Sequence, residues 1–310
     1  MSILEAHHLY KNYHLKGKVL AAVQDVSLRM DGNEVLAFLG ANGAGKTTTI
    51  KMIAGLILPD QGSVRISGRD PHRDPWALRS LGAVLEGTRN LYWRLTPEEN
   101  LEYFGVLRGL TRSGARRRTL ELLDRFDLTH KRREMVQTLS RGMQQKLAIA
   151  VALIHDPQLL LLDEPTLGLD VEATETVKTI IREVAAEGRA ILLTTHQLDI
   201  AEELSHRVAI IQNGAIAIEQ PTATLIRQFS GTAYTIELAL GLDSDRMSKV
   251  EALGGVVKGN TIYVREPEIV YEVLDLLKPL PLIKVEQDQA SLTEIFLQVI
   301  HPVNAPSPSL

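Results

Sequence analysis

The chain has 310 residues, carries 34 basic and 38 acidic side chains for a formal net charge of −4, and contains no cysteine. The missing cysteines exclude disulfide frameworks, zinc–cysteine sites, iron–sulfur clusters and a cysteine nucleophile. Since 45% of the residues are hydrophobic and 23% are charged, the chain can bury a core, and its length predicts about two domains. The near balance of charges gives no overall attraction to nucleic acid or anionic lipid.

The sequence shows no targeting or membrane-spanning pattern. Its first residues, MSILEAHHLYKNY, lack the basic head and apolar stretch of a signal peptide. The longest apolar runs, 147–154 and 159–162, fall well short of the roughly 20 residues that cross a bilayer. We therefore expect a soluble protein of a reducing compartment that serves a membrane, if at all, only from its side.

Strand-like and helix-like segments alternate over the first 230 residues, which is the pattern of a partly parallel sheet with helices on its faces. Residues 87–138 have a helical spacing of apolar residues and few strand formers, so we predict a helical insertion there. The fold class is therefore α/β. In chain order, the predicted strands are 34–39, 63–67, 81–85, 159–163, 191–195, 207–211 and 215–219, and the predicted helices are 46–54, 141–154 and 171–186.

The pattern of strand-like and helix-like segments changes after residue 230 and predicts a small α+β domain. Strand-like segments at 233–239, 261–264 and 283–286 alternate with helix-like segments at 244–253, 268–277 and 291–300. This is the order of a split β-α-β plaited unit of about 70 residues. The end of the chain is rich in Pro and Ser, which is typical of a frayed tail. We predict domains at 1–230 and 231–302, followed by a disordered tail at 303–310.

The segment GANGAGKT at 40–47 fits the phosphate-loop pattern G-x-x-x-x-G-K-[ST]. It follows an apolar strand and opens a helix, so its backbone N–H groups and the helix N-terminus can hold an anion. Lys46 is the expected point charge for the β- and γ-phosphates, and the Thr47 hydroxyl is an expected Mg²⁺ ligand. The competing interpretation is a glycine-rich turn that binds nothing. The predicted nucleotide-binding residues are Gly40, Asn42, Gly43, Ala44, Gly45, Lys46, Thr47 and Thr48.

Two carboxylates end the apolar segment LLLLDEP at 159–165. Asp163, at the carboxyl end of a strand beside the phosphate loop, is predicted to bind Mg²⁺. Glu164 is predicted to be the general base that polarises a water toward the γ-phosphate. An apolar strand that ends in Asp is common and says little by itself. Together with the phosphate loop, it predicts phosphoryl chemistry.

Three further motifs carry a family resemblance. The segment LSRGMQQK at 139–146 lies just before LLLLDEP, which is followed by TLGLD at 166–170 and TTH at 194–196. In this order, and with the phosphate loop, residues 3–230 resemble the nucleotide-binding subunit of an ABC transporter. The resemblance implies the P-loop NTPase fold of ABC ATPases and ATP hydrolysis, with ATP and Mg²⁺ as cofactors. It also implies two partners. One is an integral-membrane permease, and the other is a second copy of the chain, with which this chain forms a homodimer that holds two ATP molecules between its subunits.

The resemblance further implies roles for single residues. Ser140 and Gly142 would meet the γ-phosphate of ATP bound to the second subunit, although Ser140 read alone is better explained as a helix cap. His196 would be the switch histidine that contacts the γ-phosphate, where the alternative is a buried structural histidine. Asp170 would lie in the loop that crosses the dimer interface.

Some positions depart from the family pattern or fit it less directly. Tyr13 falls where the family stacks an aromatic ring on adenine, and Tyr10 is close enough to be an alternative. Glu86 stands where the family has a glutamine; we predict that it still reaches Mg²⁺, as a third carboxylate. Arg141 and Met143 replace the commoner Gly and Gln of the signature. The phosphate-facing residues Ser140 and Gly142 are kept.

Two surface features outside the motifs can each be interpreted as purely structural or as functional. Tyr92 and Trp93, just before the helical insertion, either pack normally or form a groove for the cytoplasmic helix of a membrane partner. The basic clusters 116–118 and 131–133 are best explained as a solvated helix face beside acidic residues. Contact with lipid headgroups or nucleic acid is the alternative, but no aromatic side chains interleave to stack bases.

The C-terminal domain bears on the direction of transport. Its segment SLTEIFL at 291–297 resembles the C-terminal extension of exporter ATPases of the drug-resistance and polysaccharide-export type, which favours export. The expected location is cytoplasmic, peripheral on the inner face of the cell membrane. The alternative functions are a soluble ABC-type ATPase switch that acts on nucleic acid or ribosomes, and an ATPase regulated by a small-molecule sensor domain. ABC-type ATPases of this switch class usually carry two nucleotide sites or a coiled-coil insertion in one chain. This sequence has one set of motifs and no heptad stretch, so we expect no nucleic-acid partner.

Overall fold

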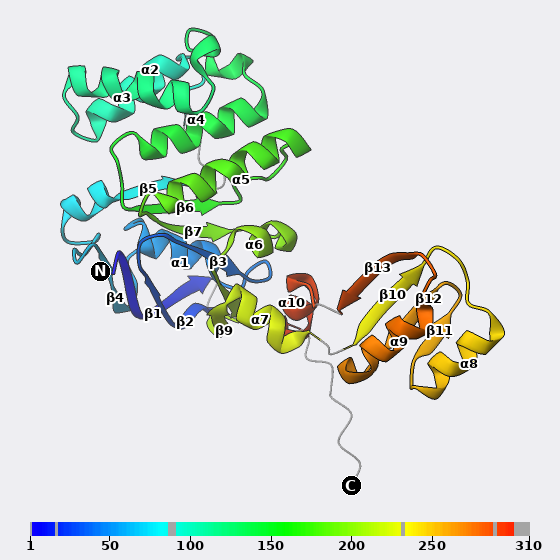
Figure 1. Cartoon of the computed structure of the whole chain (residues 1–310). Helices are drawn as coiled ribbons and strands as arrows, with labels where there is room; N and C mark the ends of the chain where they lie inside the picture. Colours follow the sequence, from blue (N-terminus) through cyan, green and yellow to red (C-terminus); the bar gives the residue numbers. More distant parts are fainter. Residues whose placement is uncertain (1, 16–17, 86–90, 231–232, 288–289, 301–310) are drawn as a thin grey trace. The chain divides into compact units, whose positions relative to one another are not determined.

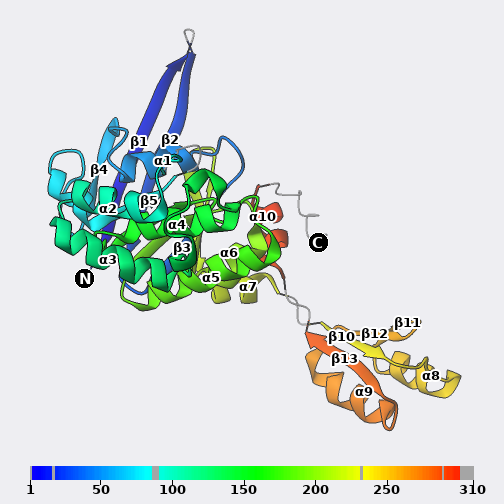
Figure 2. The same cartoon turned by 90° about the horizontal axis from the view of Figure 1, so that it is seen from above.

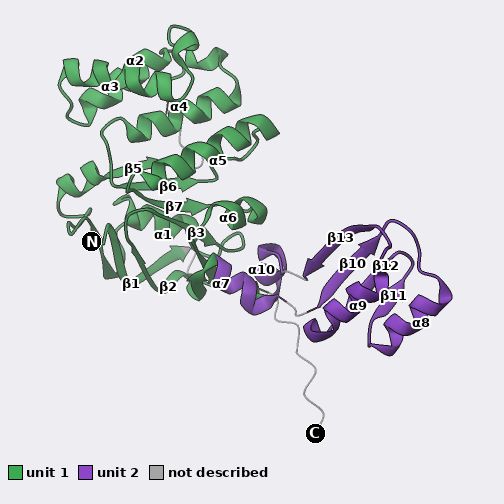
Figure 3. Ribbon diagram, in the orientation of Figure 1, with its two compact units in different colours: residues 1–222, 299–310 green, residues 223–298 purple. Residues whose placement is uncertain are grey.

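The computed structural model describes residues 2–15, 18–85, 91–230, 233–287 and 290–300. The chain divides into two compact units, 1–222 with 299–310, and 223–298 (Figure 3). The division therefore follows Thr222 rather than residue 230, because helix α7 (Thr222–Phe229), which the sequence pattern did not predict, groups with the residues after it. The predicted tail at 303–310 lies outside the described residues.

A six-stranded sheet forms the centre of the first unit (Figure 1). Its first five strands pair in parallel, and the last pairs antiparallel to its neighbour. Central strands covered on both faces need continuous apolar sequences, which is why AILLT and the apolar part of LLLLD can be buried throughout. In spatial order the strands are β5 (Leu81–Val84), β6 (Leu159–Asp163), β7 (Ala190–Thr194), β3 (Glu34–Leu39), β8 (Arg207–Gln212) and β9 (Ala215–Pro221).

A second, antiparallel sheet has the strand order β2-β1-β4, formed by β2 (Lys18–Met30), β1 (Leu4–Leu15) and β4 (Gln61–Ile66). The β1–β2 hairpin, which the sequence pattern did not predict, projects from the unit in Figure 2. Helix α1 (Lys46–Ile53) shares one buried apolar cluster with both sheets, to which it contributes Ile50, Met52 and Ile53. The phosphate loop is therefore anchored from behind by a rigid core.

Helices form the other part of the first unit. Helix α4 (Arg141–Leu153) contacts β5, and α5 (Val171–Ala186) and α6 (Leu198–Leu204) contact β3. The described part of the helical insertion contains α2 (Pro97–Leu107) and α3 (Arg112–Arg125), together with short 3₁₀ turns. Helix α2 begins with a reciprocal capping box between Thr96 and Glu99.

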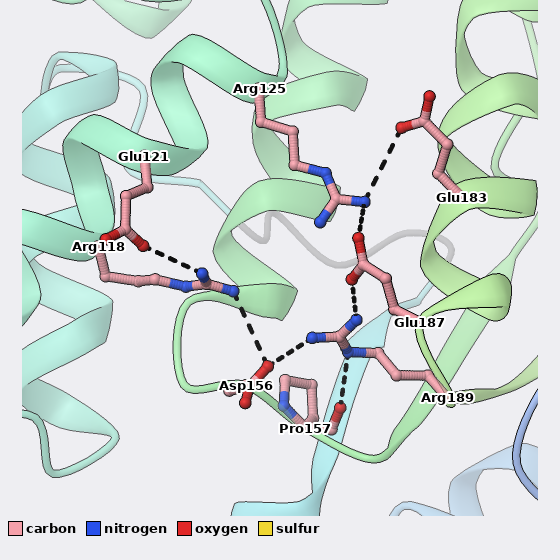
Figure 4. A network of polar contacts seen from close by, with 8 residues as sticks. All are labelled: Arg118, Glu121, Arg125, Asp156, Pro157, Glu183, Glu187 and Arg189. Atoms are coloured by element: carbon pink, nitrogen blue, oxygen red, sulfur yellow. Dashed lines mark hydrogen bonds and ion pairs between the residues drawn. The ribbon is translucent and has the colours of Figure 1, made fainter.

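An ion-pair network joins helix α3 to the turn before β6 and to the end of α5 (Figure 4). Arg118 pairs with Asp156 at 3.8 Å, and Arg125 pairs with Glu187 at 2.7 Å. Arg189 links these two ion pairs, because its guanidinium pairs with both Asp156 and Glu187 and its Nε donates to the carbonyl of Pro157 at 3.1 Å. The insertion is thus tied to the sheet by alternating charges as well as by apolar packing.

The second unit contains a four-stranded antiparallel sheet in the order β11-β12-β10-β13. Helices α8 and α9 contribute Val250, Val273 and Leu277 to the core on one face of this sheet. The strands and helices from β10 to β13 follow a β-α-β-β-α-β order, in which the sequence pattern had not predicted the strand β11. In chain order the elements are β10 (Tyr234–Leu238), α8 (Ser244–Ala252), β11 (Val256–Lys258), β12 (Thr261–Val264), α9 (Val270–Leu277), β13 (Leu282–Gln287) and α10 (Leu292–Ile300). Over the described residues of both units, no helix has the length and apolar character needed to span a membrane.

Candidate functional site

The glycine-rich loop between β3 and α1 is held tightly against its surroundings. A Cβ on Gly40 would lie 2.5 Å from the carbonyl oxygen of Ile211, and a Cβ on Gly45 would lie 2.5 Å from that of Ala22. Gly45 also has φ 111°, which side chains disfavour. Both positions therefore require glycine, so that the loop can pass close to β8 and β2.

The loop presents one charged group and several hydrogen-bond donors. The ammonium of Lys46 donates to the carbonyl oxygens of Gly40 and, at 3.1 Å, of Ala41. Ala44 faces the core, its N–H donates to the Ala41 carbonyl at 3.1 Å, and its own carbonyl accepts from Gly214 at 3.0 Å. Ala44 and Gly40 thus support the loop from behind rather than lining the space in front of it.

A cavity of about 260 Å³ opens in front of the loop. It brings the phosphate loop together with the acidic end of β6, as the sequence motifs predicted. Leu20, Ala22 and Ala41 also line it, and the sequence analysis missed them. The lining residues are Tyr13, Leu20, Ala22, Ala41, Asn42, Gly43, Gly45, Lys46, Thr47, Thr48, Asp163 and Glu164.

Tyr13 and Leu20 belong to the two strands of the projecting hairpin. They are direct register partners between β1 and β2, so their side chains lie next to each other at the cavity. An aromatic ring beside an exposed leucine offers a flat apolar surface to a nucleotide base. Tyr10 pairs instead with Gln61 of β4 and is not among the lining residues.

The two carboxylates at the end of β6 have different environments. Asp163 is buried and accepts a hydrogen bond from the Thr194 hydroxyl on β7. Glu164 has φ 52°, a conformation that is strained for a residue with a side chain, and its N–H donates to the Thr194 carbonyl at 3.0 Å. The strained turn leaves only 10% of the Glu164 side chain exposed and points it at His196, whose Nδ1 lies 3.0 Å from Oε1.

The Thr47 hydroxyl and the Asp163 carboxylate are the oxygen ligands that Mg²⁺ prefers, and both line the cavity. In the described part of the chain, no group of three or more His, Cys, Asp or Glu side chains could hold a metal ion. This donor set fits Mg²⁺ that takes its remaining ligands from water and nucleotide phosphates. Glu86, the third predicted ligand, lies outside the described residues.

The signature residues surround a separate hollow of about 290 Å³. The Ser140 hydroxyl accepts from the N–H of Met143 at 3.2 Å and caps α4, and Asp170 accepts from the N–H of Ala173 at 2.8 Å and caps α5. A Cβ on Gly142 would lie 2.7 Å from that of Ala173, so glycine lets the two helix starts approach. The lining is Asp127, Ser140, Gly142, Met143, Lys146, Asp170, Glu172, Ala173 and Thr176, none of which lines the first cavity.

Lys146 is the residue of this second hollow that the sequence analysis quoted but gave no role. It lies about 1.7 helical turns along α4 from Ser140, on the side that faces the hollow, and adds a cationic side chain to a helix N-terminus. The helical spacing of the signature motif could have identified it.

Comparison with known proteins agrees with this geometry. The family model described as ABC transporter matches residues 23–167. The ABC transporter ATP-binding protein NatA of Bacillus subtilis is 40% identical over 207 residues, which cover 66% of this chain and 84% of NatA. The daunorubicin/doxorubicin resistance ATP-binding protein DrrA of Streptomyces peucetius is 36% identical over 242 residues, covering 78% of this chain and 72% of DrrA.

Solved structures show the same fold. An ATP-binding subunit of an ABC transporter superposes with a TM-score of 0.65 at 34% identity, covering 73% of this chain and 93% of that one. A dimeric ATP-binding cassette in a post-hydrolysis state, bound to ADP and Pi, superposes with a TM-score of 0.63 at 25% identity, covering 71% and 98%. This chain belongs to the ABC transporter family, as an ATP-binding subunit and ATPase whose hydrolysis of ATP is coupled to transport.

Proposed function

We propose that two copies of this chain close over two ATP molecules and thereby drive export through a separate integral-membrane permease, from the cytoplasmic face of the membrane. The observation that carries the two-copy arrangement is the separation of the nucleotide residues into two hollows with no residue in common. A single chain offers the phosphate loop in one and the signature helix in the other. In a dimer, the signature helix of each chain would close the phosphate-loop cavity of the other chain, which gives two complete nucleotide sites.

The surface around the signature hollow supports a contact between two copies. Val171, directly after Asp170, is 82% exposed, and Leu167 before it is exposed as well. Exposed apolar side chains beside a polar hollow are typical of an interaction surface. The Ser140 hydroxyl, the start of α4 and Lys146 would meet the γ-phosphate held by the other copy.

The chemistry we propose for the first cavity is phosphoryl transfer to water. Lys46 and the loop N–H groups would hold the phosphates, and Thr47 and Asp163 would hold Mg²⁺. When bound, Mg²⁺ neutralises charge that develops on the phosphate oxygens. Glu164 accepts the proton of the attacking water, and His196 orients the Glu164 carboxylate at the γ-phosphate.

The permease would dock on the helical insertion. A hollow of about 740 Å³ opens there between α2 and α3, and its floor includes the exposed apolar residues Tyr103, Val106 and Leu107. Tyr92 packs edge-to-face on Tyr103 with ring centroids 5.0 Å apart, yet remains exposed, so the aromatic cluster is both packed and accessible. Such a surface fits an amphipathic helix of a partner.

The observations favour transport over a nucleic-acid function. Arg118 and Lys131, from the two basic clusters, form ion pairs with Glu121 and Glu134. These acidic neighbours reduce the positive field that nucleic-acid binding needs. Two relatives, DrrA of Streptomyces peucetius and the linearmycin resistance protein LnrL of Bacillus subtilis, carry drug-resistance names, which supports export of a drug.

Purification of the full chain with its genomic neighbours tests the proposal. We expect an integral-membrane protein to co-purify, and ATP-dependent loss of a dye from right-side-out vesicles that contain the complex and enclose ATP. Glu164→Gln is the control, since it should retain the complex and ATP binding but not the efflux. Association with ribosomes or DNA instead of a membrane protein would contradict the transport role, and dye uptake would contradict its direction.

A further inference from the structure

The edge strand β13 of the second unit has an open side. It pairs with β10, and within the described residues no strand pairs with its other side. All six of its residues are exposed, including Leu282, Ile283 and Val285. The opposite edge strand, β11, has only three residues. Open strands with apolar side chains are templates for pairing with another chain.

The charges on β13 are arranged for pairing with a copy of itself. Lys284 stands opposite Glu237, and Glu286 stands opposite Thr235, so both charged side chains lie on the same face of the sheet. In an antiparallel pair centred on Val285, Lys284 of each copy faces Glu286 of the other. Val285 then faces its own copy on the opposite face of the sheet.

Other arrangements of the two strands are less favourable. A parallel, in-register pair would place Lys284 against Lys284 and Glu286 against Glu286, and like charges directly opposite each other destabilise a sheet. Centring the antiparallel pair one half-residue earlier would place Lys284 against Val285 and Ile283 against Glu286. The sequence of the strand therefore selects one register.

We infer that β13 is a self-association surface, through which the second units of two copies join in an antiparallel strand pair centred on Val285. Lysine on an edge strand usually prevents the strand from pairing with strands of unrelated proteins. Here the same Lys284 meets a carboxylate only when the partner is this chain. The contact uses no residue of either nucleotide hollow, so it should hold two copies together without ATP and raise the local concentration at which the ATPase units meet.

Cysteine cross-linking tests this in the full chain, which has no cysteine of its own. Opposed residues of an antiparallel pair have Cα atoms about 4.5–5.5 Å apart, within the ~4.4–6.8 Å range of disulfides. Val285→Cys should therefore form a covalent dimer on mild oxidation without nucleotide. Val256→Cys on β11 is the matched control, because both valines are 41% exposed, and it should remain monomeric.

Charge variants in the Val285→Cys background distinguish contacts between chains from contacts within one. Lys284→Glu alone and Glu286→Lys alone should each reduce cross-linking by about tenfold, because they place like charges opposite each other. A mixture of the two variants should restore it as heterodimers, whose charges are complementary across the pair although the Lys284–Glu286 ion pair within each strand is lost. Circular dichroism checks that each variant is folded.

Three outcomes would overturn the inference: equal cross-linking at Val285 and Val256, no response to the charge variants, or cross-linking that requires ATP. The ATP-bound dimer of the ATPase units is measured separately, as a shift in size of Glu164→Gln with and without ATP. Failure of the β13 contact can thus be told apart from failure of the nucleotide-dependent dimer.

Discussion

His196 on the loop after β7 holds the carboxylate of Glu164 at the end of β6. Its ring Nδ1 lies 3.0 Å from Oε1, and its main-chain N–H donates to Oε2 at 3.4 Å. Adjacent parallel strands bring the two residues together, because Asp163 and Thr194 are register partners. The strained backbone of Glu164 is thus matched by two contacts that fix its side chain.

This relationship predicts different effects for the two residues. Glu164→Gln should lower ATP hydrolysis by about 10²–10⁴-fold, as expected for loss of a general base. His196→Ala should lower the hydrolysis rate less, because the carboxylate remains but is no longer held. Steady-state ATPase rates and ATP affinity check this. A His196→Ala enzyme with unchanged rate, or a Glu164→Gln enzyme that no longer binds ATP, would contradict the assignment.

The hairpin surface predicts a role for Tyr13 in base binding. Tyr13→Ala should weaken ATP binding by about 1–3 kcal/mol, the typical value for loss of a ring that stacks on a base. Tyr13→Phe should bind ATP nearly as well as the original protein. Tyr10→Ala is the matched control, and titration of a fluorescent ATP analogue is the measurement. If Tyr10→Ala weakened binding and Tyr13→Ala did not, the alternative tyrosine would be the correct one.

His155 predicts a loss of stability on acidification. Burial, and then the nearby Arg108 guanidinium, lower its pKa from 6.5 to about 4, despite an opposing hydrogen bond to the Leu81 carbonyl. Because the folded pKa lies below the unfolded one, the stabilisation is complete above pH 6.5 and is lost as the pH falls toward 4. The effect is at most roughly 3 kcal/mol.

Urea unfolding of the original protein and of His155→Gln at pH 7.5 and at pH 5 measures this contribution. The glutamine can still donate to the Leu81 carbonyl but does not titrate. The difference between the two proteins should therefore change with pH in favour of the variant at pH 5. Parallel pH profiles for both proteins would show that His155 is not the group responsible.

The ion-pair network predicts that Arg189 contributes more to stability than other surface arginines. Burial alone would raise the pKa of Glu187, but hydrogen bonds from Arg125 and Arg189 outweigh it and hold the pKa below its ordinary value. Only 12% of the Arg189 side chain is exposed, so Arg189→Ala removes one ion-pair partner from each of Asp156 and Glu187 and the donor to the Pro157 carbonyl. The expected cost is about 1–3 kcal/mol.

Arg117 provides the matched control, because its side chain is 81% exposed and lies 3.9 Å from Glu121. Arg117→Ala should cost less than about 0.5 kcal/mol. Thermal unfolding of both variants is the measurement. Equal effects would mean that the network does not hold the insertion.

The sequence predicted the elements whose signals are local. The buried strand β6 was recognisable because a run of leucines ends in two carboxylates, and the phosphate loop because its glycines and Lys46 are adjacent in the chain. The β1–β2 hairpin was missed because register shifts and the positive φ of His8 and Asp25 break its alternation. Leu20 could not be assigned to the nucleotide cavity without that hairpin.

Contacts that depend on strand order were also beyond the sequence. Nothing in the spacing of Glu164 and His196 states that β6 and β7 are neighbours. The capping hydrogen bond of Ser140 and the surrounding hollow show that its structural and its proposed phosphate-binding roles are compatible, where the sequence set them against each other. Lys146 is a different case, because the helical spacing of the signature motif was enough to place it on the side of α4 that lines the hollow.

Mixing two inactive variants tests the central claim, that one chain's phosphate loop works with the other chain's signature. Lys46→Ala removes the first and Ser140→Ala the second, and each should hydrolyse almost no ATP by itself. A mixed dimer contains one intact site, formed by the phosphate loop of the Ser140→Ala chain and the signature of the Lys46→Ala chain. The account predicts that ATP hydrolysis reappears on mixing. Activity that stays at the sum of the two separate samples, with mixed dimers present, would contradict it.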